Sequence, residues 1–171
     1  METVENTPLT GLIFGFASEG KVDDQTVERL ISLFSLLLQN KCVLVIAEND
    51  PILQHPSFLH FINTSEIIPS LLNGDQIPST DHSVVHIMKW RGPACYNEII
   101  TSLAATGASM IVHYSEASIG YSSHPFVPVF RLTKKSQGNG IEDSVMEDEE
   151  DHLIMQKIVR VLSREKKTVV R

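Results

Sequence analysis

Residue types that carry acid–base and metal chemistry follow apolar runs at three places in this chain. Ser18-Glu19 follows the run 9–16, Glu48-Asn49-Asp50 follows the run 42–47, and the segment 113–124 mixes histidine, glutamate and serine. Carboxylates and imidazoles transfer protons and bind divalent metals. These three segments are therefore where the sequence predicts a functional site.

Glu48 is the candidate for a catalytic acid, base or metal ligand, because it lies at the carboxyl end of the apolar run 42–47, where α/β sheets bind ligands. The same carboxylate is also suited to capping a short helix that begins after it. Asn49, Ser18 and Glu19 are candidates for binding a ligand beside it, since their side chains donate or accept hydrogen bonds.

His113, Glu116 and His124 are metal-ligand types that lie within twelve residues of one another. Their spacing matches no strict metal motif. The alternative for His113 is a histidine satisfied within the core or at a sheet edge, and the alternative for His124 is a residue that closes a turn before Pro125. The sequence thus proposes His113 and His124 as metal ligands without deciding between these roles.

The rest of this segment is a polar loop whose hydroxyl groups can donate hydrogen bonds to an anionic ligand. Its candidate ligand-binding residues are Ser115, Glu116, Ser118, Gly120, Ser122 and Ser123. Serines are also ordinary loop residues, so both readings stay open. Neither the glycine spacing of a dinucleotide-binding loop nor a Gly-x-Ser-x-Gly nucleophile motif is found in the chain.

Strands and helices alternate along the chain and would position these loops. Short apolar runs rich in β-branched residues predict strands at 9–16, 42–47, 83–89, 109–114 and 126–132. Apolar residues at helical spacing predict helices at 24–39, 94–106 and 149–165, with shorter helical pieces at 56–61 and 65–72. Gly107 is expected to end a helix in the left-handed conformation.

This alternation predicts an α/β fold, a three-layer Rossmann-like sandwich with a mostly parallel five-stranded sheet. A single domain is expected over residues 9–168, with a mobile acidic insertion at 134–151. In such a sheet, ligands bind outside the carboxyl ends of the strands, where the three polar segments would lie.

Bulk composition narrows the classes of partner. The chain has 171 residues, a net charge of −7 and 42% hydrophobic residues, and seven carboxylates lie between Glu142 and Asp151. An acidic balance argues against nucleic acid and against an anionic membrane surface as partners. No apolar run approaches a membrane span, and the acidic start shows no signal-peptide pattern, so the cytoplasm is the expected location.

Cys42 and Cys95 are expected as buried thiols.

The stretch 103–133 resembles the C-terminal domain of the altronate/galactarate (sugar-acid) dehydratase family. That family joins a helix to a strand through Ala-Thr-Gly-Ala, here residues 105–108, and continues to a Pro-x-x-Pro-Val strand, here 125–129. The strand ending at Ala47-Glu48 and the last helix, which closes with Lys167-Thr168, are similar to the family's as well.

The resemblance implies a dehydratase-like domain that acts on a small anionic sugar acid, often with divalent iron. Glu48 would serve as acid, base or ligand, and residues 115–123 would form the ligand loop. The family's loop carries a Thr-Thr-Gly-Arg-Gly sequence after this strand, and its first turn reads Gly-Gly-Ser-Asp. Residues 114–123 contain no arginine, and residues 15–19 read Gly-Phe-Ala-Ser-Glu.

These departures and the short length leave two functions open. One is a hydro-lyase domain. It would form one part of a split enzyme if a partner chain supplies the missing N-terminal region. The other is a catalytically silent Rossmann-like module that binds a ligand or another protein.

Overall fold

A parallel sheet of seven strands forms the centre of the molecule, in the order β3-β4-β2-β1-β5-β6-β7. The computed structural model describes residues 9–64, 71–72, 77, 84–90, 95–116, 124–136 and 143–168. The strands are β1 (Ile13–Glu19), β2 (Val43–Ala47), β3 (Leu71–Leu72), β4 (Val84–Met88), β5 (Met110–Ser115), β6 (Val129–Thr133) and β7 (Ser144–Val145).

The predicted α/β, Rossmann-like class is confirmed, but the prediction of five strands is wrong. The five long strands lie where the sequence places them, and β3 and β7 add two residues each at the sheet edges. β3 occupies the end of a segment predicted as helix, and β7 lies in the predicted acidic insertion. Two-residue strands are too short to show a period in the sequence, so pattern reading misses them.

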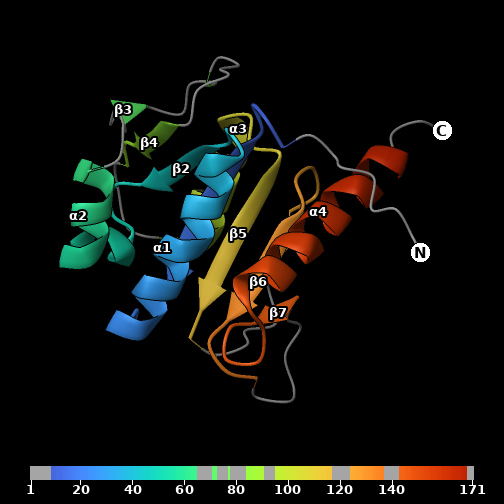
Figure 1. Ribbon diagram of the computed structural model, residues 1–171. Helices are drawn as coiled ribbons and strands as arrows, with labels where there is room; N and C mark the ends of the chain where they lie inside the picture. The colour runs from blue at the N-terminus through green and yellow to red at the C-terminus, as the bar shows by residue number, and fades with distance from the viewer. Residues whose placement is uncertain are drawn as a thin grey trace.

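Helices cover both faces of the sheet (Figure 1). Helices α1 (Asp24–Gln39), α2 (Pro56–Thr64) and α4 (Asp151–Thr168) contribute to one apolar cluster, whereas α3 (Tyr96–Ala105) contributes to the other. A short 3₁₀ helix, η1 (Pro51–Gln54), follows β2. The result is the predicted three-layer arrangement, with α3 on the face opposite the other three helices.

Strand β1 shows how the pleat divides the core. Phe14 and Phe16 belong to the cluster under α1 and α4, while Ile13 and Ala17 belong to the cluster under α3. Successive side chains of a strand point to opposite faces, so both faces of this central strand are buried. Gly15 lies on the α3 side, where a Cβ atom would come within 3.2 Å of the Leu103 Cβ atom. The glycine lets α3 pack directly onto β1.

The turn after α3 and the two cysteines each test a local prediction. Gly107 has φ +92°, which confirms the left-handed residue after the third helix. Cys42 is buried as expected, but Cys95 is exposed, and both thiols are free. No helix in the described ranges is long and apolar enough to cross a membrane.

Candidate functional site

The carboxyl ends of β1 and β5 meet at the point where the chain order reverses. The chain passes from β1 to β2 on one side, while β5 and then β6 continue the sheet on the other. Glu19 pairs in register with Ser115, so the loops that follow the two strands start side by side. Open α/β sheets bind ligands in the crevice at such a switch point.

Four predicted ligand-binding residues are brought together here: Ser18, Glu19, Ser115 and Glu116. Glu116 is exposed, the Glu19 side chain is 42% exposed, and Ser115 is buried. Gly20 turns the chain with φ +84°, and a Cβ atom at that position would lie 3.7 Å from the Glu116 Cβ atom. The structure therefore places two accessible carboxylates at neighbouring strand ends, Glu19 as the last residue of β1 and Glu116 directly after β5.

Lys21 lies in the same loop and is exposed. None of the ion pairs found among the described residues involves it. The sequence analysis did not select this lysine, because a single cation in a loop carries no motif. Its position makes it a cation that a ligand carboxylate could meet at this edge.

Asp50 is a buried carboxyl group beside the carboxyl end of β1; the sequence placed it in a candidate segment but did not select it as a site residue. Its side chain is 5% exposed and accepts three hydrogen bonds: from the Ser18 amide at 2.8 Å, from the Ser18 hydroxyl at 2.5 Å, and from the Ile52 amide at 3.0 Å. Burial raises the pKa of Asp50 to about 6, although these hydrogen bonds oppose the rise. The available signal was the Asp-Pro pair, which marks a helix start.

Glu48 lies toward β4, on the side of β2 away from β1. Glu48 is exposed, and its Oε1 atom accepts a hydrogen bond of 2.6 Å from the Trp90 amide just after β4. The carboxylate thus joins the ends of β2 and β4, a role that neither predicted alternative describes. Asn49 is half-buried, and its Oδ1 atom has no hydrogen-bond partner among the described residues.

His113 is a core histidine of β5, as one of its two predicted roles requires. It is 3% exposed, and its ring lies 4.3 Å from the ring of Tyr96. Its Nε2 atom is 3.5 Å from Oε2 of Glu19. Burial, with a smaller contribution from the Arg131 charge, lowers the pKa of His113 to about 4, so the imidazole is neutral near pH 7.

The structure does not bring the proposed metal ligands together. The contacts of His124 are with Phe126, whose amide donates to Nδ1 at 3.3 Å. In the described part of the chain, no group of three or more His, Cys, Asp or Glu side chains is placed to hold a metal ion. His113 and Glu19 form only a pair, so the residues described do not fit an iron site. The ligand-loop candidates Ser118, Gly120, Ser122 and Ser123 lie outside the described residues.

The N-terminus of α1, also at this edge, is capped from within the protein. Asp23 accepts a 2.9 Å hydrogen bond from the Thr26 amide and forms a short ion pair with Lys134, which follows β6. The Lys134 hydrogen bond and the Thr26 cap lower the pKa of Asp23 to about 2. Because a carboxylate already satisfies this helix end, the arrangement agrees with the missing dinucleotide motif.

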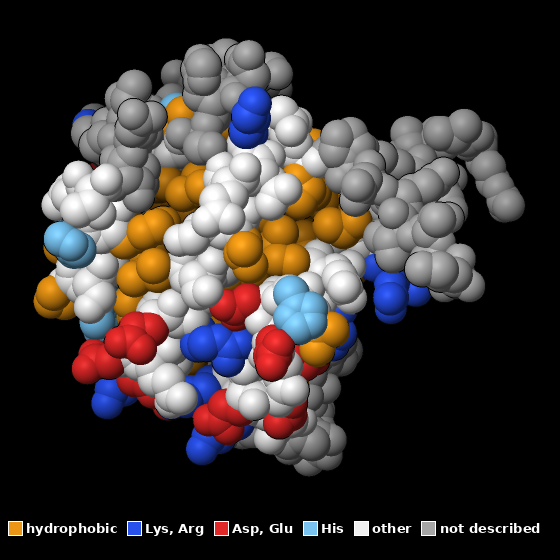
Figure 2. All heavy atoms as spheres, in the orientation of Figure 1, with side chains coloured by type: hydrophobic (Ala, Val, Ile, Leu, Met, Phe, Trp, Pro, Cys, Tyr) orange, Lys and Arg blue, Asp and Glu red, His pale blue; other side chains and the backbone are white. Residues whose placement is uncertain are grey.

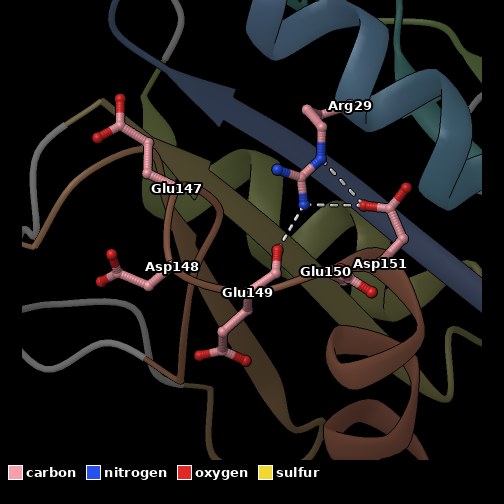
Figure 3. A pocket seen from close by; sticks show the side chains of 6 residues that line it. All are labelled: Arg29, Glu147, Asp148, Glu149, Glu150 and Asp151. Atoms are coloured by element: carbon pink, nitrogen blue, oxygen red, sulfur yellow. Dashed lines mark hydrogen bonds and ion pairs between the residues drawn. The ribbon is translucent and has the colours of Figure 1, made fainter.

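Charged side chains gather along the lower part of the face carrying α1 and α4, the end toward which β5 points (Figures 1 and 2). Two hollows adjoin Arg29 in this region, of about 290 and 170 Å³. In the larger one, Arg29 reaches Asp151 and the Glu149 carbonyl, while Glu147 and Asp148 point away from it (Figure 3). The guanidinium is therefore occupied by the protein's own acceptors.

Comparisons of this chain with family models, with curated proteins and with solved structures give no match.

Proposed function

We propose that this chain is a sugar-acid dehydratase-like domain that binds a small polyhydroxylated acid at the edge where β1 and β5 end. The observation that supports the proposal is the strand order, which puts Glu19, the last residue of β1, and Glu116, the residue after β5, at neighbouring strand ends of a switch point. The sequence resemblance suggests the ligand class, and the geometry of this edge supports the proposed location.

The accessible groups at this edge suit such a ligand. Carboxylates accept hydrogen bonds from ligand hydroxyl groups, as Glu19 and Glu116 would here. Lys21 would meet a carboxylate of the ligand, in place of the arginine that the family's loop carries. Lys134 is engaged by Asp23 and is less available for this purpose.

A complete hydro-lyase would need more than this edge. Divalent iron is a prediction of the resemblance, and its ligands would have to include residues outside the described ranges or on a partner chain. We therefore propose the split-enzyme form, in which this domain positions the acid and a partner chain completes the reaction.

The second candidate is a catalytically silent binding module. It is favoured by the internal contacts at the carboxyl edge: Glu48 binds the Trp90 amide, and Asp23 binds Lys134. Polar groups used to join loops are less available to a substrate. A silent module of this kind would bind a ligand or a protein without turnover.

Thermal unfolding of the purified chain with galactarate and altronate, each with and without ferrous iron under anaerobic conditions, tests the proposal. Binding to the native state raises the melting temperature in a saturable way. The shift should be lost in Glu19→Gln and retained in Glu28→Gln, an exposed glutamate on α1. If neither acid shifts the melting temperature under any of these conditions, the ligand-binding proposal fails and the silent protein-binding module gains weight.

A further inference from the structure

Asp50 has a protein environment that a capping role alone does not explain. Its carboxyl group caps the start of η1 by accepting a hydrogen bond from the Ile52 amide. It also accepts hydrogen bonds from both the amide and the hydroxyl of Ser18. Ser18 is half-buried near the carboxyl end of β1, next to Glu19. A side chain of β1 thus links the interior to the candidate site.

Asp23 shows what a capping aspartate looks like elsewhere in this protein. It is partly exposed, and its charge is balanced by Lys134. No cation is found in contact with Asp50 among the described residues, and the carboxyl group is almost fully buried. Burying a carboxylate without a counter-charge costs stability, whereas asparagine caps a helix about as well without that cost.

A buried carboxyl group that costs stability is a candidate for function. Burial shifts the pKa of Asp50 into the range in which a carboxyl group exchanges protons near neutral pH. Other titratable groups of this region contact partners other than Asp50. Glu48 accepts from the Trp90 amide, Glu19 pairs with His113, and His55 pairs with Asp24. The Ser18 hydroxyl, near the carboxyl end of β1, donates its hydrogen bond to Asp50.

We propose that Asp50 is the acid–base group of the carboxyl-edge site and that the Ser18 hydroxyl carries the proton between Asp50 and the bound acid. The α-proton of the ligand passes to Ser18 Oγ as the Ser18 proton passes to Asp50 Oδ1. The electron pair of the broken C–H bond stays on the ligand. The reverse transfer returns a solvent-exchanged proton to the same carbon, so the cycle is balanced without another reactant. This inference rests on the proposed function.

Exchange of the α-protons of galactarate in D₂O, followed by ¹H NMR, tests the proposal without requiring dehydration. The wild-type chain should exchange them at a rate that rises with pH around 6, where Asp50 loses its proton. Asp50→Asn should lower the rate by about 100-fold, the range of general acid–base catalysis. Ser18→Ala should also lower the exchange rate. This variant keeps the hydrogen bond that the backbone amide of residue 18 donates to Asp50. Glu28→Gln, which neutralises an exposed carboxylate on α1 outside the relay, should leave the rate unchanged.

Galactarate binding is measured on the same samples by thermal shift, which separates the two proposals. Binding with exchange that Asp50→Asn and Ser18→Ala abolish supports the relay. Binding with no exchange, or with exchange unaffected by Asp50→Asn, overturns the relay and leaves the proposed function standing. Absence of binding overturns both. Circular dichroism spectra of the variants establish that any loss is not one of folding.

Discussion

Arg29 on α1 donates two hydrogen bonds to the carboxylate of Asp151, the first residue of α4, from Nε at 3.1 Å and from Nη2 at 3.0 Å. The same guanidinium donates to the carbonyl oxygens of Met146 and Glu149 at 2.6 Å each. One side chain thus fastens the acidic turn between β7 and α4 to the first helix (Figure 3).

Arg29→Lys should destabilise the fold, because an ammonium group cannot reproduce four hydrogen bonds made by a planar fork. Hydrogen bonds to charged groups are worth about 1.5–3 kcal/mol each, and lysine keeps part of them, so we expect a net loss of about 2 kcal/mol. Urea unfolding measures it, with Glu28→Gln on the same helix as the control. An unchanged midpoint would mean that the turn is held by other contacts.

Asp50→Asn should stabilise the protein above pH 6 and have no such effect below pH 4. The pKa of Asp50 is about 6 in the folded protein against 3.8 for an ordinary aspartate, so the native state holds a proton that the unfolded chain has already lost. Stability from this group therefore falls as pH rises from about 4 to 6, by at most about 3 kcal/mol. Thermal unfolding of both proteins from pH 4 to 8 measures the difference. A stabilisation independent of pH would show that ionisation of Asp50 is not its source.

His113 should remain neutral well below the pH at which exposed histidines gain a proton. Its pKa is about 4, against 6.5 for an unperturbed histidine, so the unfolded chain binds this proton first and His113 removes stability as pH falls between these values. Two-dimensional NMR of the imidazole Cε1–H groups follows each histidine separately. A midpoint for His113 near 6.5 would contradict its burial against Tyr96.

Gly107→Val should lower stability by about 1–3 kcal/mol, because a β-branched residue resists the left-handed conformation. The space itself is not limiting, since a Cβ atom there would lie 3.8 Å from Ile13 Cδ1, an ordinary contact. Gly107→Asn should therefore cost less, because asparagine enters this conformation more easily. Equal losses for both variants, measured by urea unfolding, would point to crowding rather than to the backbone.

The elements that sequence reading located are those with long, repeated patterns. The apolar run of β2 and the helical spacing from Val27 to Leu38 fix their elements by local signals, and the alternation of the elements predicts the mostly parallel sheet. The rule that ligands bind at the carboxyl ends of strands selected Ser18, Glu19, Ser115 and Glu116, which the register of β1 and β5 brings together.

The parts that it missed depend on contacts between distant segments. Asp50 binds Ser18 across 32 residues, and Glu48 binds Trp90 across 42, so nothing local distinguishes the buried carboxyl group from the exposed one. The sequence consequently favoured Glu48 as the acid–base residue, whereas the geometry favours Asp50. His113 was selected by residue type alone, and no local signal shows that Tyr96 covers it.

We propose that a sugar acid binds where β1 and β5 end, and ¹H–¹⁵N correlation spectra recorded during a titration with galactarate test this proposal. We expect saturable shifts of the amides of Ser18, Glu19, Gly20, Lys21 and Glu116. Amides around Arg29 and along α4 should move little. Spectra that stay unchanged up to saturating acid, or shifts confined to the region of Arg29 and α4, would contradict it.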